Sequence, residues 1–341
     1  MSVTGAGVLG PRDGIIGDQR YSGTGFISIS GRACPETLKM RSGIPILRHP
    51  KVFTEGVSRT ALLNVSSSLG DDMIPVVVAE CWAKCLGDCR GKITGEHIIT
   101  EGIWASDEIG VSGLPWCRET HQFIGVKNFT KNMLCERHNS TLSPVDQGGI
   151  AAFDTFRQAA AVHNQRSLNI ESGFRTGRFD LCTYKLDGTL LERWFLKTLI
   201  NIEFAGAQNL TIGPYFGQPI PACDLVEVAY GKRSLTGNAG LYFVAGLRET
   251  VKLEERVKYT SLIATSAHGE FVAAGQFVFF GFTFLLLVDP AAKIKIEKPS
   301  VEMAMIHRPY KLLFTVNELP SQEIEIPWPD RPAQAPEAST P

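Results

Sequence analysis

Apolar residues recur at intervals of three or four in two segments of the chain, and this spacing predicts helices with one buried face. The first helix begins at Ser143, a serine cap that is followed by Pro144 in the first helical position and by Asp146 in the capping-box position. The second helix covers Thr189 to Phe204, and a short helix is expected from Cys135 to Leu142. The predicted buried positions are Ile150, Phe153, Phe156 and Ala160 in the first helix and Leu191, Trp194, Phe195, Leu199 and Ile202 in the second.

From about residue 210 onward the pattern changes to short runs of β-branched and aromatic residues, which predict strands. The longest apolar run, Phe271 to Val288, approaches the length of a membrane span, but Gln276, two glycines and Thr283 interrupt it. We therefore expect one or two buried strands there and no membrane helix. Further strands are expected at residues 74–78, 172–186, 240–245, 257–265, 293–298 and 310–316.

Composition places the chain among ordinary globular proteins. Of its 341 residues 44% are hydrophobic and 20% are charged, which excludes a disordered chain, a collagen and a coiled-coil rod. The net charge of −1 argues against a protein that coats nucleic acid, so any such contact needs a local basic patch. The first twenty residues lack a basic segment followed by an apolar run. We expect no export, a cytoplasmic location, and cysteines that are reduced thiols or metal ligands.

Cysteines and histidines gather between residues 81 and 138. Cys135 and His138 stand three positions apart at the start of the short helix, which is typical of one ligand pair in a tetrahedral zinc site. Any two of Cys81, Cys85 and Cys89 can supply the other pair, because polar, turn-forming residues surround all three. We therefore expect a structural zinc ion. The alternative, thiols that pack as small apolar groups, suits the remaining cysteines better.

Gly95-Glu96-His97 stands between the two predicted ligand pairs. Glu96 and Asn139 carry oxygens that suit a hard cation such as Mg²⁺, and the imidazole of His97 suits a general base that takes a proton from an attacking water. On spacing alone, two other interpretations are equally open. Glu96 and His97 can form an exposed pair, or His97 can itself be a zinc ligand.

Residues 81–146 resemble the HNH, or ββα-metal, nuclease family, in particular its zinc-stapled, treble-clef branch. The resemblance rests on the runs Gly95-Glu96-His97-Ile98-Ile99 and Cys135-Glu136-Arg137-His138-Asn139, in the order of a hairpin followed by a helix. It implies that Glu96 and Asn139 bind a catalytic Mg²⁺ or Mn²⁺ ion and that His97 is the general base. It also implies that Cys135 and His138 bind zinc with two of the upstream cysteines. The whole chain is similar to bacterial proteins described only as HNH-like.

Patterning and resemblance together predict an α+β fold, in which a zinc-stapled ββα module of treble-clef type precedes an α+β, mostly-β domain. The expected segments are an N-terminal part at 1–75, the module at 76–165, the β-rich domain at 166–326 and a disordered tail at 327–341.

The expected function is a metal-dependent endonuclease that hydrolyses phosphodiester bonds in a bacterial or phage setting, with DNA favoured over RNA as substrate. The alternative is a non-catalytic zinc module that binds nucleic acid or protein, with the β-rich domain contacting a protein partner or a ligand. One count argues against the nuclease. Residues 76–165 contain 8 Lys and Arg against 10 Asp and Glu, whereas phosphodiester substrates usually select for a basic face.

Overall fold

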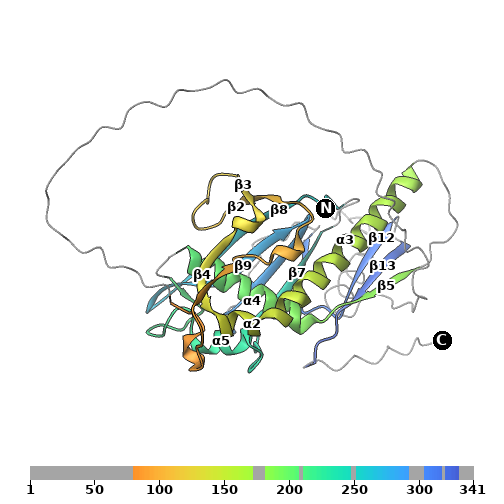
Figure 1. The fold of residues 1–341 in the computed structure, drawn as a ribbon. Helices are drawn as coiled ribbons and strands as arrows, with labels where there is room; N and C mark the ends of the chain where they lie inside the picture. Colours follow the sequence, from red (N-terminus) through yellow and green to blue (C-terminus); the bar gives the residue numbers. More distant parts are fainter. Residues whose placement is uncertain are drawn as a thin grey trace, which may run out of the picture. The chain divides into compact units, whose positions relative to one another are not determined.

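The computed structural model describes residues 80–171, 181–206, 210–246, 251–291, 303–316 and 319–329. Within these ranges the chain combines helices with a larger amount of sheet, so the predicted α+β class is confirmed at this level (Figure 1). The N-terminal segment 1–75, the strands predicted at 74–78 and 293–298, and most of the predicted tail lie outside the described residues.

An eight-stranded sheet is the largest element of the fold. Seven of its strands lie in the order β11-β7-β10-β9-β8-β2-β3, and β6 pairs with β9. The strands are β2 (Glu108–Ser112), β3 (Gln122–Gly125), β6 (Thr211–Ile212), β7 (Gly240–Gly246), β8 (Arg256–Ser266), β9 (Gly269–Phe279), β10 (Phe282–Leu287) and β11 (Met303–His307). Because β2 runs parallel to β8, segments on both sides of the boundary predicted at 165/166 share one sheet.

The long apolar run forms two strands, β9 and β10, which pair antiparallel. They are joined at Phe280 and Gly281, which both have positive φ angles, of 50° and 82°. Turns of this kind match the twist of a hairpin and favour glycine, so Phe280 is an unusual residue there. Its ring is buried and packs against Trp104 and Phe153. No helix in the described part of the chain is long and apolar enough to cross a membrane.

Helices α3 (Ser143–Glu171) and α4 (Gly188–Ala205) pack against each other and against this sheet through aromatic side chains. The ring of Phe153 on α3 lies 5.0 Å from Trp194 of α4 and 5.1 Å from Phe279 of β9, measured between centroids. Phe195 of α4 lies 4.8 Å from Phe284 of β10. Both predicted helices and their buried stripes are confirmed, with Ile150 half-buried and the other eight positions buried.

The start of α3 differs from the prediction in one respect. The backbone N–H groups of Val145 and Asp146 donate to the carbonyl of Leu142, and the carboxylate of Asp146 does not serve as a cap. It accepts instead from the Thr100 hydroxyl and from the ammonium group of Lys197 on α4. The capping-box prediction for Asp146 is therefore wrong, because a buried ion pair uses this carboxylate.

The other described strands form two smaller sheets. β1 (Ile93–His97) pairs antiparallel with β4 (Thr130–Cys135), and the short helix α2 (Glu136–Thr141) follows β4 directly. In the other sheet β13 (Leu319–Glu325) lies between β12 (Lys311–Val316) and β5 (Cys182–Lys185). Cys182 is disulfide-bonded and thus departs from the expectation of reduced thiols. Cys81, Cys85, Cys89, Cys117, Cys135 and Cys223 are free thiols.

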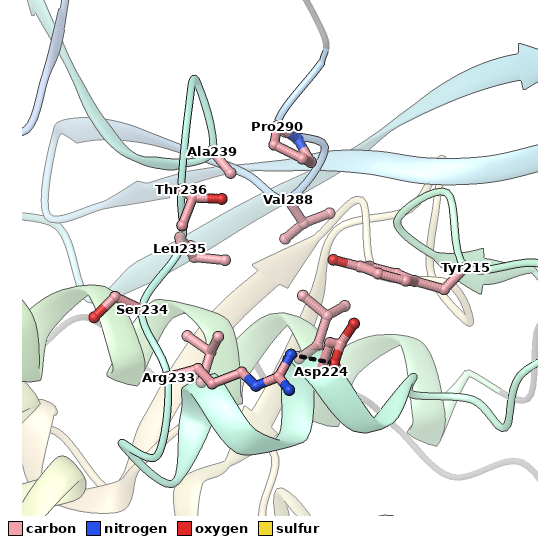
Figure 2. A pocket seen from close by; sticks show the side chains of 11 residues that line it. Tyr215, Asp224, Arg233, Ser234, Leu235, Thr236, Ala239, Val288 and Pro290 are labelled. Carbon is pink, nitrogen blue, oxygen red and sulfur yellow. Dashed lines mark hydrogen bonds and ion pairs between the residues drawn. The ribbon is translucent and has the colours of Figure 1, made fainter.

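A cavity of about 400 Å³ lies beside the short helix α5 (Cys223–Ala229), which the sequence patterning did not predict. Figure 2 shows its apolar residues, among them Leu235 and Val288, and the ion pair at its edge. In that pair Arg233 Nη1 lies 2.7 Å from Asp224 Oδ1. None of the predicted site residues lines this cavity, so it is separate from the metal centre described next.

Candidate metal centre

A tight loop carries the first two candidate ligands, Cys81 and Cys89. Between them the chain makes one short turn of 3₁₀ helix, η1 (Lys84–Leu86), and then reverses at Gly87, whose φ of 80° is accessible to glycine at little cost. The backbone N–H of Trp82 donates to Met133 in β4, which ties the start of the loop to the β1–β4 pair. We call residues 81–89 the ligand loop.

The end of β4 and the first turn of α2 carry the other two ligands. Cys135 is the last residue of β4 and precedes α2, and His138 lies one turn further on. The N–H groups of Glu136 and Arg137 donate to the carbonyls of Lys92 and Arg90, which follow the ligand loop. These hydrogen bonds place the loop and the helix start side by side.

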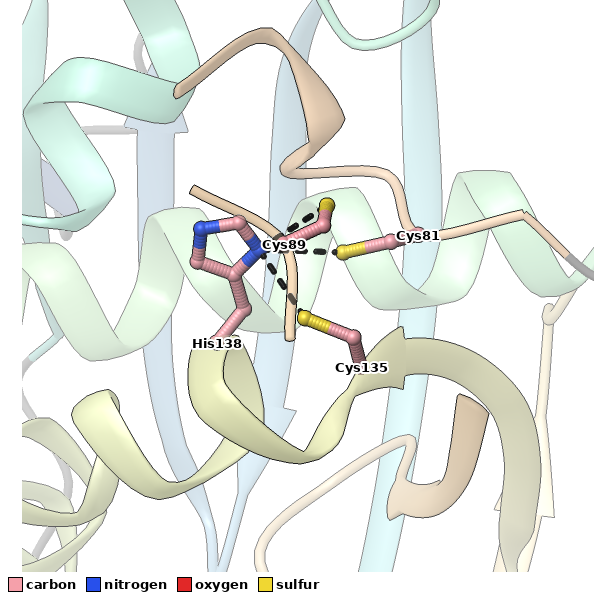
Figure 3. A group of neighbouring side chains, drawn as sticks. All are labelled: Cys81, Cys89, Cys135 and His138. Atoms are coloured by element: carbon pink, nitrogen blue, oxygen red, sulfur yellow. Dashed lines mark hydrogen bonds between the residues drawn. The ribbon is translucent and has the colours of Figure 1, made fainter. Parts of the chain in front are cut away.

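Three sulfur atoms converge on one ring nitrogen of His138 (Figure 3). The Nδ1 atom lies 3.2 Å from Cys81 Sγ, 3.3 Å from Cys135 Sγ and 3.6 Å from Cys89 Sγ. All four candidate ligand atoms lie within 4.8 Å of one another. A neutral imidazole nitrogen that faces sulfur has one lone pair, so it can accept only one of these three contacts as a hydrogen bond. Hydrogen bonding alone therefore does not explain the arrangement.

A tetrahedral metal ion does explain it. Zinc binds sulfur at about 2.3 Å and imidazole nitrogen at about 2.0–2.1 Å, so a tetrahedral site separates a sulfur from a nitrogen ligand by roughly 3.5 Å. The three separations around His138 agree with that value to within a few tenths of an ångström. The cluster of three cysteines and one histidine can thus hold a metal ion such as zinc.

The thiol pKa values point to the same need for a cation. The pKa of Cys81 is raised to about 12. Burial is the largest cause of this rise, and the neighbouring Cys135 and Cys89 contribute to it. Burial is the largest single influence on the pKa of Cys135 and acts to raise it, but hydrogen bonds to the backbone of His138 and Arg90, together with those to Cys81 and Cys89, leave this pKa lowered. Several thiolates in one partly buried cluster repel one another, and a bound cation removes this repulsion.

Asp88, which the sequence analysis did not select, orients the histidine. With Nδ1 directed at the sulfurs, the opposite ring nitrogen Nε2 donates to Asp88 Oδ1 at 2.7 Å, and Arg137 Nε contacts the other carboxylate oxygen at 2.6 Å. Hydrogen bonds from Arg137 and His138 lower the pKa of Asp88 to about 2. A carboxylate that holds the second nitrogen of a ligating histidine is usual in metal sites. In the sequence, the signal that could have identified Asp88 is its position directly before Cys89.

Cys85 lies outside the cluster, although it was one of three candidates for the upstream pair. Its side chain is half-buried in η1 and is not among the convergent ligand atoms. The described structure therefore selects Cys81 and Cys89 from the three cysteines. Cys117 is buried and also stands apart from the cluster.

Glu96 is buried and paired with a cation that the chain itself supplies. Its Oε1 lies 2.5 Å from Nζ of Lys197, and the same Nζ lies 2.5 Å from Asp146 Oδ1. Only 2% of the Lys197 side chain is exposed. Burial raises the pKa of Glu96, and the ion pair with Lys197 opposes this effect. Around this pair, Trp194 Nε1 donates to the Thr100 hydroxyl, which in turn donates to Asp146.

His97 and Asn139 make other contacts. His97 Nε2 lies 3.4 Å from Glu101 Oε2, and 30% of the His97 side chain is exposed. Asn139 Nδ2 donates to the hydroxyl of Thr94 on β1 at 3.0 Å. In the described part of the chain, no hydrogen bond or ion pair joins Glu96, His97 and Asn139 to one another.

Comparisons of the chain with protein-family models, with curated proteins and with solved structures gave no match.

Proposed function

We propose that residues 80–142 form a zinc-stapled module of treble-clef type and that its zinc ion is structural. The convergence of three sulfurs on His138 Nδ1 carries this proposal. Four protein donors fill a tetrahedral shell, whereas a catalytic zinc ion keeps one position for water or substrate. Cys81 and Cys89 would hold the ligand loop, and Cys135 and His138 the start of α2, so that one ion joins two segments.

The module's role in this proposal is to bind a partner rather than to catalyse a reaction, and nucleic acid is the partner that we propose. Lys92, beside β1, and Lys131 on β4 are exposed, as are Arg90 and Lys127. Exposed cations near a β-ribbon suit phosphate contacts, whose strength falls as salt rises.

Cobalt substitution tests the zinc proposal directly. The protein is unfolded in chelator, refolded with Co²⁺ and examined by absorption spectroscopy, with Cys89→Ser and Cys85→Ser as a matched pair. We expect thiolate-to-cobalt and tetrahedral d–d bands in the wild type and in Cys85→Ser, and altered bands in Cys89→Ser. Octahedral cobalt without thiolate bands in the wild type would contradict the proposal.

A metal-dependent endonuclease is the second candidate, and the hydrogen bond from Asn139 to Thr94 favours it. This bond joins the helix-borne asparagine to the strand that carries Glu96 and His97. In such an enzyme Glu96 and Asn139 would bind a Mg²⁺ or Mn²⁺ ion, and His97 would take the proton of the attacking water. We rank this candidate second because Lys197 would have to release Glu96 before Glu96 could bind a cation.

Cleavage assays separate the two candidates. Wild type, His97→Ala and the control His121→Ala, which changes another exposed histidine, are incubated with plasmid, single-stranded DNA and RNA, with Mg²⁺, Mn²⁺ or EDTA. Cleavage that needs the cation and is lost only in His97→Ala would establish the nuclease. Salt-dependent binding in all three proteins without cleavage would support the binding module. Equal cleavage in all three would contradict the assignment of His97, and neither binding nor cleavage would contradict nucleic acid as the partner.

A further inference from the structure

The cavity beside α5 shares no residue with the metal centre, and the proposed function does not use it. Its volume of about 400 Å³ lies in the lower part of the range of about 300–1,000 Å³ that is usual for sites of small molecules. Its lining comes from α5, from the loop 233–239 before β7 and from the segment that follows β10, and Tyr215 lies at another side (Figure 2). A cavity of this size suits a ligand with few atoms.

One part of the cavity wall is apolar and buried. Its side chains come from α5, from the loop before β7 and from the first residue after β10, and they are Leu225, Val228, Leu235, Ala239 and Val288. Contact between such side chains and an apolar ligand removes both surfaces from water, which favours binding. This part of the cavity therefore suits the hydrocarbon body of a ligand.

Hydrogen bonds hold the cavity walls in place. The N–H of Asn238 donates to the carbonyl of Pro290, which joins the loop before β7 to the segment after β10. The buried guanidinium group of Arg308 donates to the carbonyl of Leu235 and is itself paired with Glu192 of α4. Walls that are fixed in this way lose little conformational entropy when a ligand binds.

The polar part of the wall has an excess of acidic groups. Asp224 lines the cavity, and its Oδ1 accepts from Nη1 of Arg233 at 2.7 Å, which leaves the second carboxylate oxygen for another donor. Arg233 is shared between two acids, because its Nε lies 2.5 Å from Oε2 of Glu227. Asp289 stands between two residues that line the cavity and adds a third acid. Together these three acids exceed the charge of Arg233.

The hydroxyl of Tyr215 lies in the field of these groups, and Figure 2 shows that it points into the cavity. Burial is the largest cause that raises the pKa of Tyr215. Asp224 and Asp289 raise this pKa further, against a smaller opposite effect of Arg233. The electrostatic potential at the hydroxyl therefore favours a cation. In the described part of the chain these acids do not converge as metal ligands, so the cation that fits is an organic one.

We propose that this cavity binds a small primary amine, positively charged at neutral pH, whose body is a short branched chain or a single ring. The ammonium group donates to the carboxylate of Asp224 and to the hydroxyl of Tyr215, and the body packs against apolar side chains such as Val288. This site goes beyond the zinc module, and it depends neither on a zinc ion nor on nucleic-acid binding.

Isothermal titration calorimetry of the full-length protein at neutral pH tests the proposal. The probes are 3-methylbutylamine and 2-phenylethylamine, with 3-methyl-1-butanol as the uncharged control and 4-methylpentanoate as the anionic control. We expect saturable binding of at least one amine, with one molecule per chain. Binding of the alcohol should be weaker by at least about tenfold, because the alcohol cannot form a charge-assisted hydrogen bond. No binding of the carboxylate is expected.

Three variants locate the bound amine. Asp224→Asn should weaken amine binding by at least about tenfold, and Tyr215→Phe by a smaller factor, since it removes a neutral hydrogen-bond partner. Glu270→Gln, at an exposed acid that does not line the cavity, should leave the affinity unchanged. Circular dichroism shows whether each variant is folded.

Three results would overturn the proposal. They are a folded wild type that binds neither amine, equal affinity for an amine and the alcohol, and an amine affinity that is the same in wild type, Asp224→Asn and Tyr215→Phe. Bound zinc is measured on the same samples to keep this site apart from the zinc module. A protein that binds the amine but holds no zinc would support the amine site and contradict the zinc module.

Discussion

Two largely buried polar clusters contact the β1–β4 pair, and they differ in the positive charge that can compensate their anions. At the end of β4, three cysteines and one histidine surround a point at which a metal ion such as zinc can bind. On β1, Glu96 and the neighbouring Asp146 share the ammonium group of Lys197. Buried anions need a compensating charge, which Lys197 supplies in one cluster and which a metal ion can supply in the other.

Glu203 of α4 shows a third arrangement, in which a buried carboxyl group accepts a tyrosine hydroxyl. One oxygen of this buried carboxyl group accepts the hydroxyl of Tyr259, and the other has no hydrogen-bond partner. Burial is the main cause that raises the pKa of Glu203. The comparison therefore predicts that the three sites respond to different changes: removal of metal, removal of Lys197, and pH.

The largest effect is expected for Cys135→Ser. In small zinc domains, the free energy of binding structural zinc contributes up to about 10–16 kcal/mol to folding. Loss of one sulfur ligand should therefore lower the free energy of unfolding by several kcal/mol. Urea unfolding followed by circular dichroism measures this. Cys117→Ser, at a buried thiol outside the cluster, is the control and should lose only about 1–3 kcal/mol. Equal losses in both variants would show that Cys135 is an ordinary core thiol.

Lys197→Met should have the next largest effect. The substitution keeps most of the side-chain volume but leaves the buried Glu96 and the half-buried Asp146 without their cation, which costs about 3–5 kcal/mol. In the double variant Glu96→Gln, Lys197→Met, one of these charges is also removed, and part of the loss should be recovered. If the single variant is as stable as the wild type, the ammonium group is not the required cation.

Asp88→Asn should weaken metal retention without unfolding the protein. Loss of a carboxylate that orients a histidine ligand typically lowers metal affinity by about 10- to 100-fold. Release of zinc to a coloured chelator measures the change, and Asp154→Asn, at an acid that pairs with Arg157 on α3, is the control. Identical release from both variants would mean that Asp88 does not support His138.

Glu203→Gln should change the pH dependence of stability, which is the smallest of these effects. Because its pKa is raised in the folded protein above the ordinary value of 4.5, the folded state holds this proton more tightly than the unfolded state. Stability of the wild type should therefore fall as pH rises from 4.5 through the folded pKa, and Glu203→Gln should lack this component. Parallel unfolding profiles between pH 4 and 8 would contradict a raised pKa of this buried carboxyl group.

Features set by nearby residues could be predicted from the sequence. The apolar stripes of α3 and α4 are long and regular, and Cys135 and His138 lie on one turn of backbone, so spacing alone identified them. Contacts between distant segments could not be predicted. The choice of Cys89 over Cys85 depends on the turn at Gly87, and the partner of Glu96 lies far along the chain on α4.

The same limit explains why the predicted boundary at 165/166 does not separate two sheets. Strands β2 and β3 are short and lack a strong alternation, and the pairing of β2 with β8 joins segments more than a hundred residues apart. For Asp146 the local signal was misleading. Its position three residues after Ser143 is typical of a cap, but the tertiary ion pair with Lys197 uses its carboxylate.

Zinc content measured on Cys89→Ser and Cys85→Ser tests the central claim most directly. Both variants remove one sulfur from the same loop, but only Cys89 lies in the cluster. Elemental analysis of the purified, gel-filtered proteins should find one zinc ion per chain in the wild type and in Cys85→Ser, and markedly less in Cys89→Ser. Loss of zinc from Cys85→Ser with retention in Cys89→Ser would contradict the assigned ligands.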